Sequence, residues 1–129
     1  MGAMDAGKLA ASVEGEVLAG AFDRGRYATD ASFYQIVPAG VVVPERFEDV
    51  EATLAFARAE GLTVGPGLVI DFSKRLNGLL ELDVDGRRAV VQPGLVLDEL
   101  NRMLKPHGLW FPVDISTSSR ATIGGICAN

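Results

Sequence analysis

The 129-residue sequence predicts an α+β fold made of two α/β subdomains, a small parallel part followed by a larger, mostly antiparallel part. Before residue 65 the chain shows a strand, a helix and a strand in that order, which is the pattern of a parallel βαβ unit. After residue 65 an alternating strand runs into Asp85-Gly86, which is typical of an antiparallel hairpin. We therefore predict a first subdomain over 5–64 and a second over 65–129.

The residues before the first predicted strand are expected to be mainly helical. Met1–Met4 resembles an expression scar followed by a second start methionine, so we leave these residues out of the predicted fold. Apolar residues then recur at helical spacing, which predicts a helix from Lys8 to about Ala21. These residues are Leu9, Val13, Val17 and Leu18. A polar, glycine-containing loop is expected over 23–32, and a short apolar segment over 33–37.

The predicted βαβ unit begins with a buried strand at Val41–Val43, which stops at Pro44. An amphipathic helix follows and ends at Gly61, which is placed for a left-handed C-cap. Its expected inner face is Phe47, Val50, Leu54 and Ala57, and its expected outer face is Glu48, Asp49, Glu51, Arg58 and Glu60. The second strand of the unit is predicted at Leu62–Val64.

The second half begins with a strand at Leu68–Phe72 and continues into a hairpin. Leu80, Leu82 and Val84 alternate with acidic residues, which indicates a half-buried strand. A two-residue type I′ turn at Asp85-Gly86 would place Arg88 opposite Asp83. The return strand covers 87–92 and stops at Pro93-Gly94. A helix is then predicted over 97–104, with Leu97, Leu100 and Leu104 inward and with Pro106 and Gly108 ending it.

Composition limits the classes of function. Seventeen acidic residues against twelve basic ones give a net charge of −5, which argues against nucleic acid as a partner. No apolar run approaches the ~18 residues that a membrane span needs. With one Cys and one His, an internal disulfide is excluded and a structural zinc site is not expected, so we predict no metal site. A reducing, cytoplasmic location is the simplest interpretation.

The isolated reactive side chains have ordinary structural explanations, so no catalytic residue is assigned. Glu81, Asp83 and Asp85 are expected on the solvated face of a strand. His107 suits the end of a helix, where a cation complements the helix dipole, and Cys127 suits a packed position.

The segment from Asp114 to Asn129 has a different character. It carries five hydroxyl side chains within seven residues, followed by two adjacent glycines that let backbone approach a ligand closely. The residues are Ser116, Thr117, Ser118, Ser119, Thr122, Gly124 and Gly125. Such a segment suits an anion such as a pyrophosphate, but Ser, Thr and Gly are also ordinary loop residues. From composition alone the two interpretations are equally supported.

Several motifs together resemble the FAD-binding (PCMH-type) domain of FAD-linked oxidases, the vanillyl-alcohol oxidase superfamily. Val91-Gln92-Pro93-Gly94 is followed by Leu97-Asp98-Glu99-Leu100, Pro106-His107-Gly108-Leu109 and the segment from Asp114 to Gly125. Tyr27–Ser32 and Val43-Pro44 are also similar. The resemblance covers nearly all of the chain after Met4 and is strongest to the glycolate oxidase and D-lactate dehydrogenase branch.

The resemblance implies that FAD is held between two α/β subdomains. Pro93 and Gly94 would approach the flavin or pyrophosphate, and the backbone N–H groups of 121–125 would face the cofactor. The residues implied to bind FAD are Pro93, Gly94, Asp114, Ser116, Thr117, Ser118, Ala121, Thr122, Ile123, Gly124, Gly125 and Asn129. In the parent enzyme a hydride would pass from a small 2-hydroxy acid to the flavin, which carries the redox step.

Two departures from this family leave alternatives open. The family has a Gly/Ser-rich pyrophosphate loop before the strand at Leu68, whereas here Val64 runs directly into Gly65-Pro66-Gly67. Either the loop is deleted or the recorded sequence omits it. The chain also ends inside the domain, so we expect a fragment whose substrate is bound by a domain that is not present. The alternative function is a truncated scaffold or interaction module that binds no cofactor and self-associates.

Overall fold

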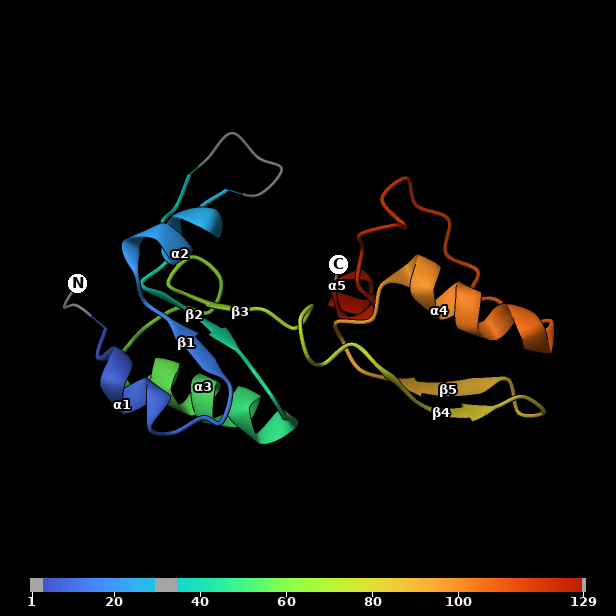
Figure 1. Ribbon diagram of the computed structural model, residues 1–129, viewed down its shortest axis with the longest axis horizontal. Coiled ribbons are helices and arrows are strands. Elements are labelled where there is room, and N and C mark those ends of the chain that lie inside the picture. Colours follow the sequence, from blue (N-terminus) through green and yellow to red (C-terminus); the bar gives the residue numbers. More distant parts are fainter. Residues whose placement is uncertain (1–3, 30–34, 129) are drawn as a thin grey trace. The chain divides into compact units, whose positions relative to one another are not determined.

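The computed structural model describes residues 4–29 and 35–128, which form two compact units (Figure 1). The first unit comprises Met1–Asp71 and the second Phe72–Asn129. The boundary falls seven residues later than the predicted one after Val64, because the segment up to Asp71 belongs to the sheet of the first unit.

In its described residues, the first unit is a three-stranded sheet in the order β1-β2-β3, combined with three helices (Figure 1). β1 is antiparallel to β2, and β2 is parallel to β3 with Gly40 beside Leu68. A βαβ unit is therefore present, but its second strand is Leu68–Ile70 and not the predicted Leu62–Val64. The strands are β1 (Glu16–Leu18), β2 (Gly40–Val43) and β3 (Leu68–Ile70), and the helices are α1 (Ala6–Ala10), α2 (Ala21–Arg26) and α3 (Phe47–Ala59).

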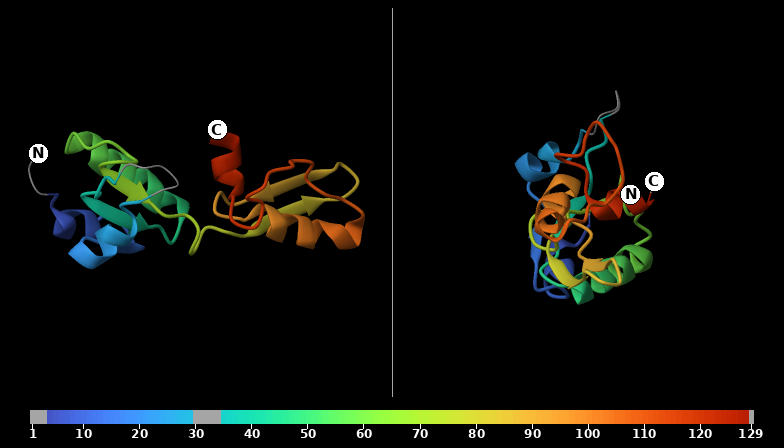
Figure 2. Two further views of the ribbon diagram at one scale, coloured as in Figure 1. Left: turned by 90° about the horizontal axis from the view of Figure 1, so that it is seen from above. Right: turned by 90° about the vertical axis from the view of Figure 1, so that its right-hand side faces the viewer.

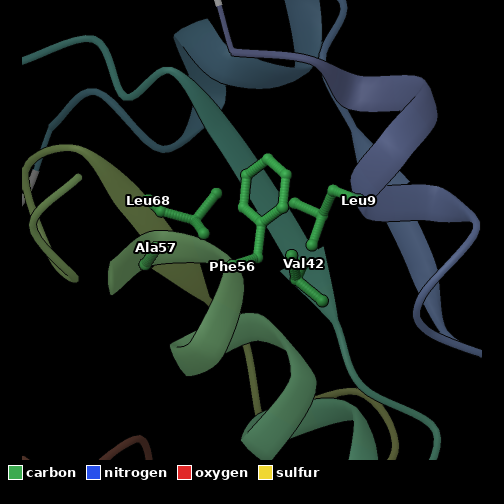
Figure 3. Packing of buried hydrophobic residues seen from close by; sticks show 5 residues of the cluster. All are labelled: Leu9, Val42, Phe56, Ala57 and Leu68. Carbon is green, nitrogen blue, oxygen red and sulfur yellow. The ribbon is translucent and has the colours of Figure 1, made fainter. Parts of the chain in front are cut away.

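The core of the first unit lies where α1, α3 and the sheet meet (Figure 3). Phe56 of α3 lies between Leu9 of α1 and Leu68 of β3, above Val42 of β2. Met4 packs against this cluster, and a Cβ added to Gly40 would lie 2.4 Å from the Met4 methyl carbon. Met4 is thus part of the fold, although the sequence suggested a scar there.

The single helix predicted from Lys8 to Ala21 is wrong. α1 ends at Ala10, and the chain then forms strand β1 and a second helix, α2, where a loop was expected. Gly15 explains part of the break, because a Cβ there would lie 2.1 Å from the Val43 carbonyl oxygen. Val13 and Val17 still pack against the core, so a loop and a strand bury the same apolar residues that a helix was expected to bury. The apolar segment predicted at 33–37 falls partly outside the described residues.

Helix α3 is confirmed, but a different face of it is buried. Phe47 and Leu54, which were predicted to point inward, are 66% and 45% exposed. The buried residues are Asp49, Val50, Thr53, Phe56 and Ala57. Gly61 has the predicted left-handed conformation, with φ of +65°.

Asp49 was predicted to face water and instead is 2% exposed. Its carboxylate accepts hydrogen bonds from the backbone N–H groups of Glu14 (2.8 Å), Gly15 (3.0 Å), Glu45 (2.8 Å) and Arg46 (3.4 Å). One side chain therefore caps α3 and also holds the loop before β1. It gives an acceptor to backbone N–H groups that would otherwise lack a hydrogen-bond partner.

The strand predicted at Leu62–Val64 is not formed as such. Val64 makes an isolated parallel bridge with Leu68, and the returning strand is β3. The intervening glycines form a tight turn, in which Gly65 N donates to Leu68 O and Leu68 N donates to Thr63 O, both over 2.9 Å.

The second unit consists of an antiparallel hairpin with a helix lying along it and a C-terminal helix (Figures 1 and 2). The residues at its core are Leu95, Leu97, Leu100, Leu104 and Ile123, so the predicted inward leucines of the helix are confirmed. Its elements are β4 (Leu79–Asp83), β5 (Arg88–Val91), α4 (Leu97–Leu104), the 3₁₀ helix η1 (Lys105–His107) and α5 (Ile123–Ala128).

The hairpin differs from its prediction in its turn and in one strand face. Arg88 lies opposite Asp83 as expected, but the connection is Val84–Arg87 and its positive φ (52°) is at Arg87. A type I′ turn would need positive φ at both Asp85 and Gly86. A register shift between Leu79 and Glu81 turns Leu79 toward the core and leaves Leu80 60% exposed.

Candidate functional site

The structure brings two of the predicted site segments together within the second unit. The Pro93-Gly94 turn and the stretch from Ala121 to Gly124 run side by side, with Val96 and Thr122 paired as an antiparallel bridge. Asp114, Ser116, Thr117 and Ser118 lie on the connection that leads into this pairing. Asn129 lies outside the described residues.

Two of the predicted glycines are required by packing within the chain. A Cβ on Gly94 would lie 2.1 Å from the Phe72 carbonyl oxygen, and a Cβ on Gly124 would lie 2.7 Å from Pro93 Cβ. Gly125 is different, because it is exposed and a Cβ there would meet only the Thr122 hydroxyl, at 3.3 Å. Of these glycines, Gly125 alone presents an open face to a ligand.

Four of the five backbone N–H groups expected to face FAD have acceptors inside the chain. Ala121 N donates to Thr117 O (2.8 Å), Ile123 N to Leu95 O (2.8 Å), Gly124 N to Pro93 O (2.9 Å) and Gly125 N to Thr122 Oγ1 (3.3 Å). In this arrangement they cannot also donate to a phosphate with full strength. The turn at Gly65-Pro66-Gly67 is similar, because its hydrogen bonds close on itself.

The hydroxyl-bearing connection is the more accessible part of the predicted site. Ser116 and Thr117 are exposed, Ser118 is half-buried, and no described residue forms a hydrogen bond with their hydroxyl groups. Their backbone is held in place, because Ser118 O accepts from Asp98 N (3.2 Å) at the start of α4. These hydroxyl groups can donate to a ligand without breaking an internal bond.

A cavity of about 670 Å³ adjoins Gly94 and includes side chains that the sequence interpretation missed. The polar side chains that were missed are Ser73, Asn77, Asp98 and Glu99, and Ser119 of the hydroxyl-rich segment joins them in the lining. No spacing links these residues, since they come from three separate segments. The carboxylate of Asp98 would repel a phosphate but accepts hydrogen bonds from sugar hydroxyl groups, so this donor and acceptor set fits the hydroxyl-rich part of FAD better than its pyrophosphate.

Within the first unit, Tyr27 belongs to one of the motifs that carried the resemblance, and it makes a polar contact of its own. The Tyr27 hydroxyl donates to Asp71 Oδ2 over 2.6 Å. Burial, together with the hydrogen bond and the negative charge of Asp71, raises the pKa of Tyr27 to about 12. The phenol is therefore neutral and holds the end of β3.

Of the isolated reactive residues, His107 lies outside these segments, whereas Cys127 lies on α5 two residues after Gly125. His107 is in η1, just before Gly108 with its positive φ of 67°. Cys127 is exposed, although a packed position was predicted. Within 4–29 and 35–128 there is no group of three His, Cys, Asp or Glu side chains placed to hold a metal ion, and no helix is long and apolar enough to cross a membrane.

Comparison with known proteins places these features in a family. Residues 61–129, more than half of the chain, match the model of the FAD binding domain family. The chain is 34% identical to a D-2-hydroxyglutarate dehydrogenase of Haemophilus influenzae, covering 88% of this chain and 13% of that protein. It is 29% identical to a glycolate oxidase subunit of Bacillus subtilis, covering 77% and 24%. The chain thus spans a minor part of these relatives.

The fold is also that of a solved structure, an alkyldihydroxyacetonephosphate synthase, with a TM-score of 0.70 and 19% identity over 84% of this chain and 28% of that one. The alignment with the Haemophilus protein has 130 positions but includes 88% of this chain, or about 114 of its 129 residues. About 16 of the aligned positions therefore have no counterpart in this chain.

Proposed function

Since this chain belongs to the FAD binding domain family, we propose that it is the FAD-binding part of an oxidoreductase that acts on a small 2-hydroxy acid. Two kinds of relative support the substrate class, a D-2-hydroxyglutarate dehydrogenase and a glycolate oxidase subunit. When bound, FAD supplies the acceptor for a hydride from the α-carbon of the substrate. The substrate would be bound by a part of the parent protein outside this chain.

The observation that carries the proposal is the pairing of the Pro93-Gly94 turn with the Ala121–Gly125 stretch beside an exposed run of hydroxyl groups. Ser116, Thr117 and Ser118 would orient the cofactor by hydrogen bonds, and the open face of Gly125 would allow close approach. Pro93, Gly94 and Gly124 would shape the site through their own packing.

Titration of the purified chain with FAD tests this assignment. We expect flavin fluorescence to be quenched in a saturable manner. Thr117→Val removes the hydroxyl group at nearly constant volume and should weaken FAD binding by about 1 kcal/mol, which is roughly fivefold. Thr117→Ser keeps the hydroxyl group and is the matched control.

The results separate the proposal from its alternative. Equal FAD affinity in Thr117→Val and Thr117→Ser would remove this hydroxyl group from the site. If the folded chain does not bind FAD at any concentration, the chain is a scaffold without cofactor. The substrate class is tested on the full-length parent, where anaerobic addition of a 2-hydroxy acid should bleach the flavin absorbance.

A further inference from the structure

Asn77-Gly78, just before β4, is the one place in the chain where an asparagine precedes a glycine. Such a pair is prone to lose ammonia from the asparagine side chain. The reason is that glycine has no Cβ to hinder the approach of its backbone nitrogen to the side-chain carbonyl carbon. Asn77 is exposed, so water reaches it. The reactivity of this pair therefore depends on what holds its groups in the folded chain.

The backbone nitrogen of Gly78 is held by Gln92, a residue of the Val91–Gly94 motif for which the FAD site gives no role. Gln92 N donates to Gly78 O over 2.8 Å, which extends the hairpin by one pair. In a regular antiparallel pair the return bond runs to the backbone carbonyl group of the partner. Here Gly78 N donates to the side-chain oxygen Oε1 of Gln92, over 2.9 Å. Gln92 thus holds Gly78 with both its backbone and its side chain.

The amide group of Asn77 is held by a different neighbour. Its Nδ2 donates to the Ser73 carbonyl oxygen over 2.9 Å, within the turn before the hairpin. A Cβ on Gly78 would lie 3.1 Å from Gln92 Oε1, so that oxygen sits close against the Gly78 backbone. The nitrogen and the carbonyl carbon that would have to join are therefore each fixed by a separate hydrogen bond.

From these contacts we infer that Asn77 is a deamidation site and that the Gln92 side chain protects it in the folded chain. When Gly78 N is released and loses its proton to hydroxide, it forms a bond to Asn77 Cγ. The Cγ–Nδ2 bond then breaks, and the nitrogen leaves as ammonia after taking a proton from water. Water opens the resulting succinimide ring at either carbonyl carbon and gives aspartate or isoaspartate. No oxidant or reductant takes part.

The product changes the cavity beside Gly94. Asn77 is part of its lining, together with Asp98 and Glu99. Deamidation adds a further carboxylate to this lining, which makes the cavity less favourable for an anionic ligand. Isoaspartate also routes the backbone through the side-chain carbon, just before β4.

Incubation in mildly alkaline buffer followed by tryptic peptide mapping tests the inference. Peptide 76–87 reports Asn77, and peptide 89–102 reports Asn101, which precedes an arginine and whose Oδ1 accepts from Phe111 N over 2.6 Å. We expect slow conversion at Asn77 in the folded chain, faster conversion in urea, and none at Asn101 in the folded chain. Fragment ions assign the change to residue 77.

Two variants at Gln92 isolate its side-chain oxygen. Gln92→Leu should speed deamidation of Asn77 roughly fivefold, the factor that corresponds to the loss of one neutral hydrogen bond. Gln92→Glu keeps an acceptor oxygen and is the matched control, so it should react as slowly as the unmodified chain. Equal rates for Gln92→Leu and the unmodified chain, or for Gln92→Leu and Gln92→Glu, would overturn the inference.

Leu104→Ala separates the hydrogen bond from stability in general. Leu104 is buried in the core of the same unit, so its truncation weakens the fold but leaves Gln92 unchanged. This variant should deamidate more slowly than Gln92→Leu. Equal acceleration in both, or a folded chain that reacts as fast as the chain in urea, would mean that Gln92 does not protect Asn77. Circular dichroism at the incubation temperature establishes that each variant is folded.

Discussion

Asp49 shows how much one side chain can hold in the first unit. Burial alone would raise the pKa of its carboxyl group, but the hydrogen bonds from the backbone N–H groups of Glu14, Glu45, Arg46 and Gly15 outweigh burial and hold the pKa below its ordinary value of 3.8. The ionised form is thus the one that the fold selects. It ties the start of α3 to a loop more than thirty residues earlier in the chain.

Asp49→Asn should destabilise the chain by about 2 kcal/mol, because buried N–H groups lose a charged acceptor. A folded-state pKa below the unfolded value means that the stabilisation is complete above about pH 4 and is lost as the pH falls through the folded-state pKa. Urea denaturation followed by circular dichroism measures both effects. Glu51→Gln, on the exposed side of the same helix, is the control and should change neither stability nor its acid dependence.

The sequence could not have revealed the role of Asp49. An acidic residue in the first turn of a helix is usually a solvated complement to the helix dipole, and the periodicity of α3 carries no information about a distant loop that covers it. The exposed Phe47 and Leu54 have the same cause. Periodicity identifies a helix and an apolar stripe, while the packing partners decide which side of the stripe is buried.

At the scale of elements, the close contacts of Gly94 and Gly124 join three segments of the second unit. Gly94→Ala and Gly124→Ala should each lower the free energy of unfolding by about 2–3 kcal/mol, because the added Cβ would overlap backbone or the Pro93 ring. Gly125→Ala should change it by less than about 0.5 kcal/mol, since the position is exposed. Denaturation followed by Trp110 fluorescence makes the comparison. Equal stability of all three variants would contradict the packing described here.

Elements with a strong local signal were predicted correctly. The hairpin, α3 and α4 combine a clear period with turn or cap residues, and the Asp83–Arg88 pairing follows from the turn position. The prediction of one long N-terminal helix was wrong, because Val13 and Val17 reach the core equally well from a loop and a strand. The bulge at Leu79/Glu81 has no sequence signal, and it reverses the face on which Leu80 lies.

At the scale of the whole molecule, the chain is two units that each have a core of their own. The sequence indicated both the change from parallel to antiparallel pairing and the family. The boundary predicted after Val64 was too early, because Gly65-Pro66-Gly67 forms a turn after which the chain returns to the first sheet as β3. The site was predicted as a list of segments. The backbone N–H groups of Ile123 and Gly124 already donate to carbonyl groups of a neighbouring segment. Sequence spacing does not show such contacts between segments.

The internally bonded N–H groups of Ala121, Ile123, Gly124 and Gly125 have a consequence for the speed of cofactor uptake. If FAD is to use these donors, the chain must first release them from their present acceptors. Association would then be limited by that opening and not by diffusion. In stopped-flow mixing, the observed rate should reach a plateau as FAD is increased, and Gly125→Ala should leave the plateau unchanged if opening begins elsewhere in the stretch. A rate that rises linearly without limit would mean that FAD binds through the exposed hydroxyl groups and leaves the backbone as it is.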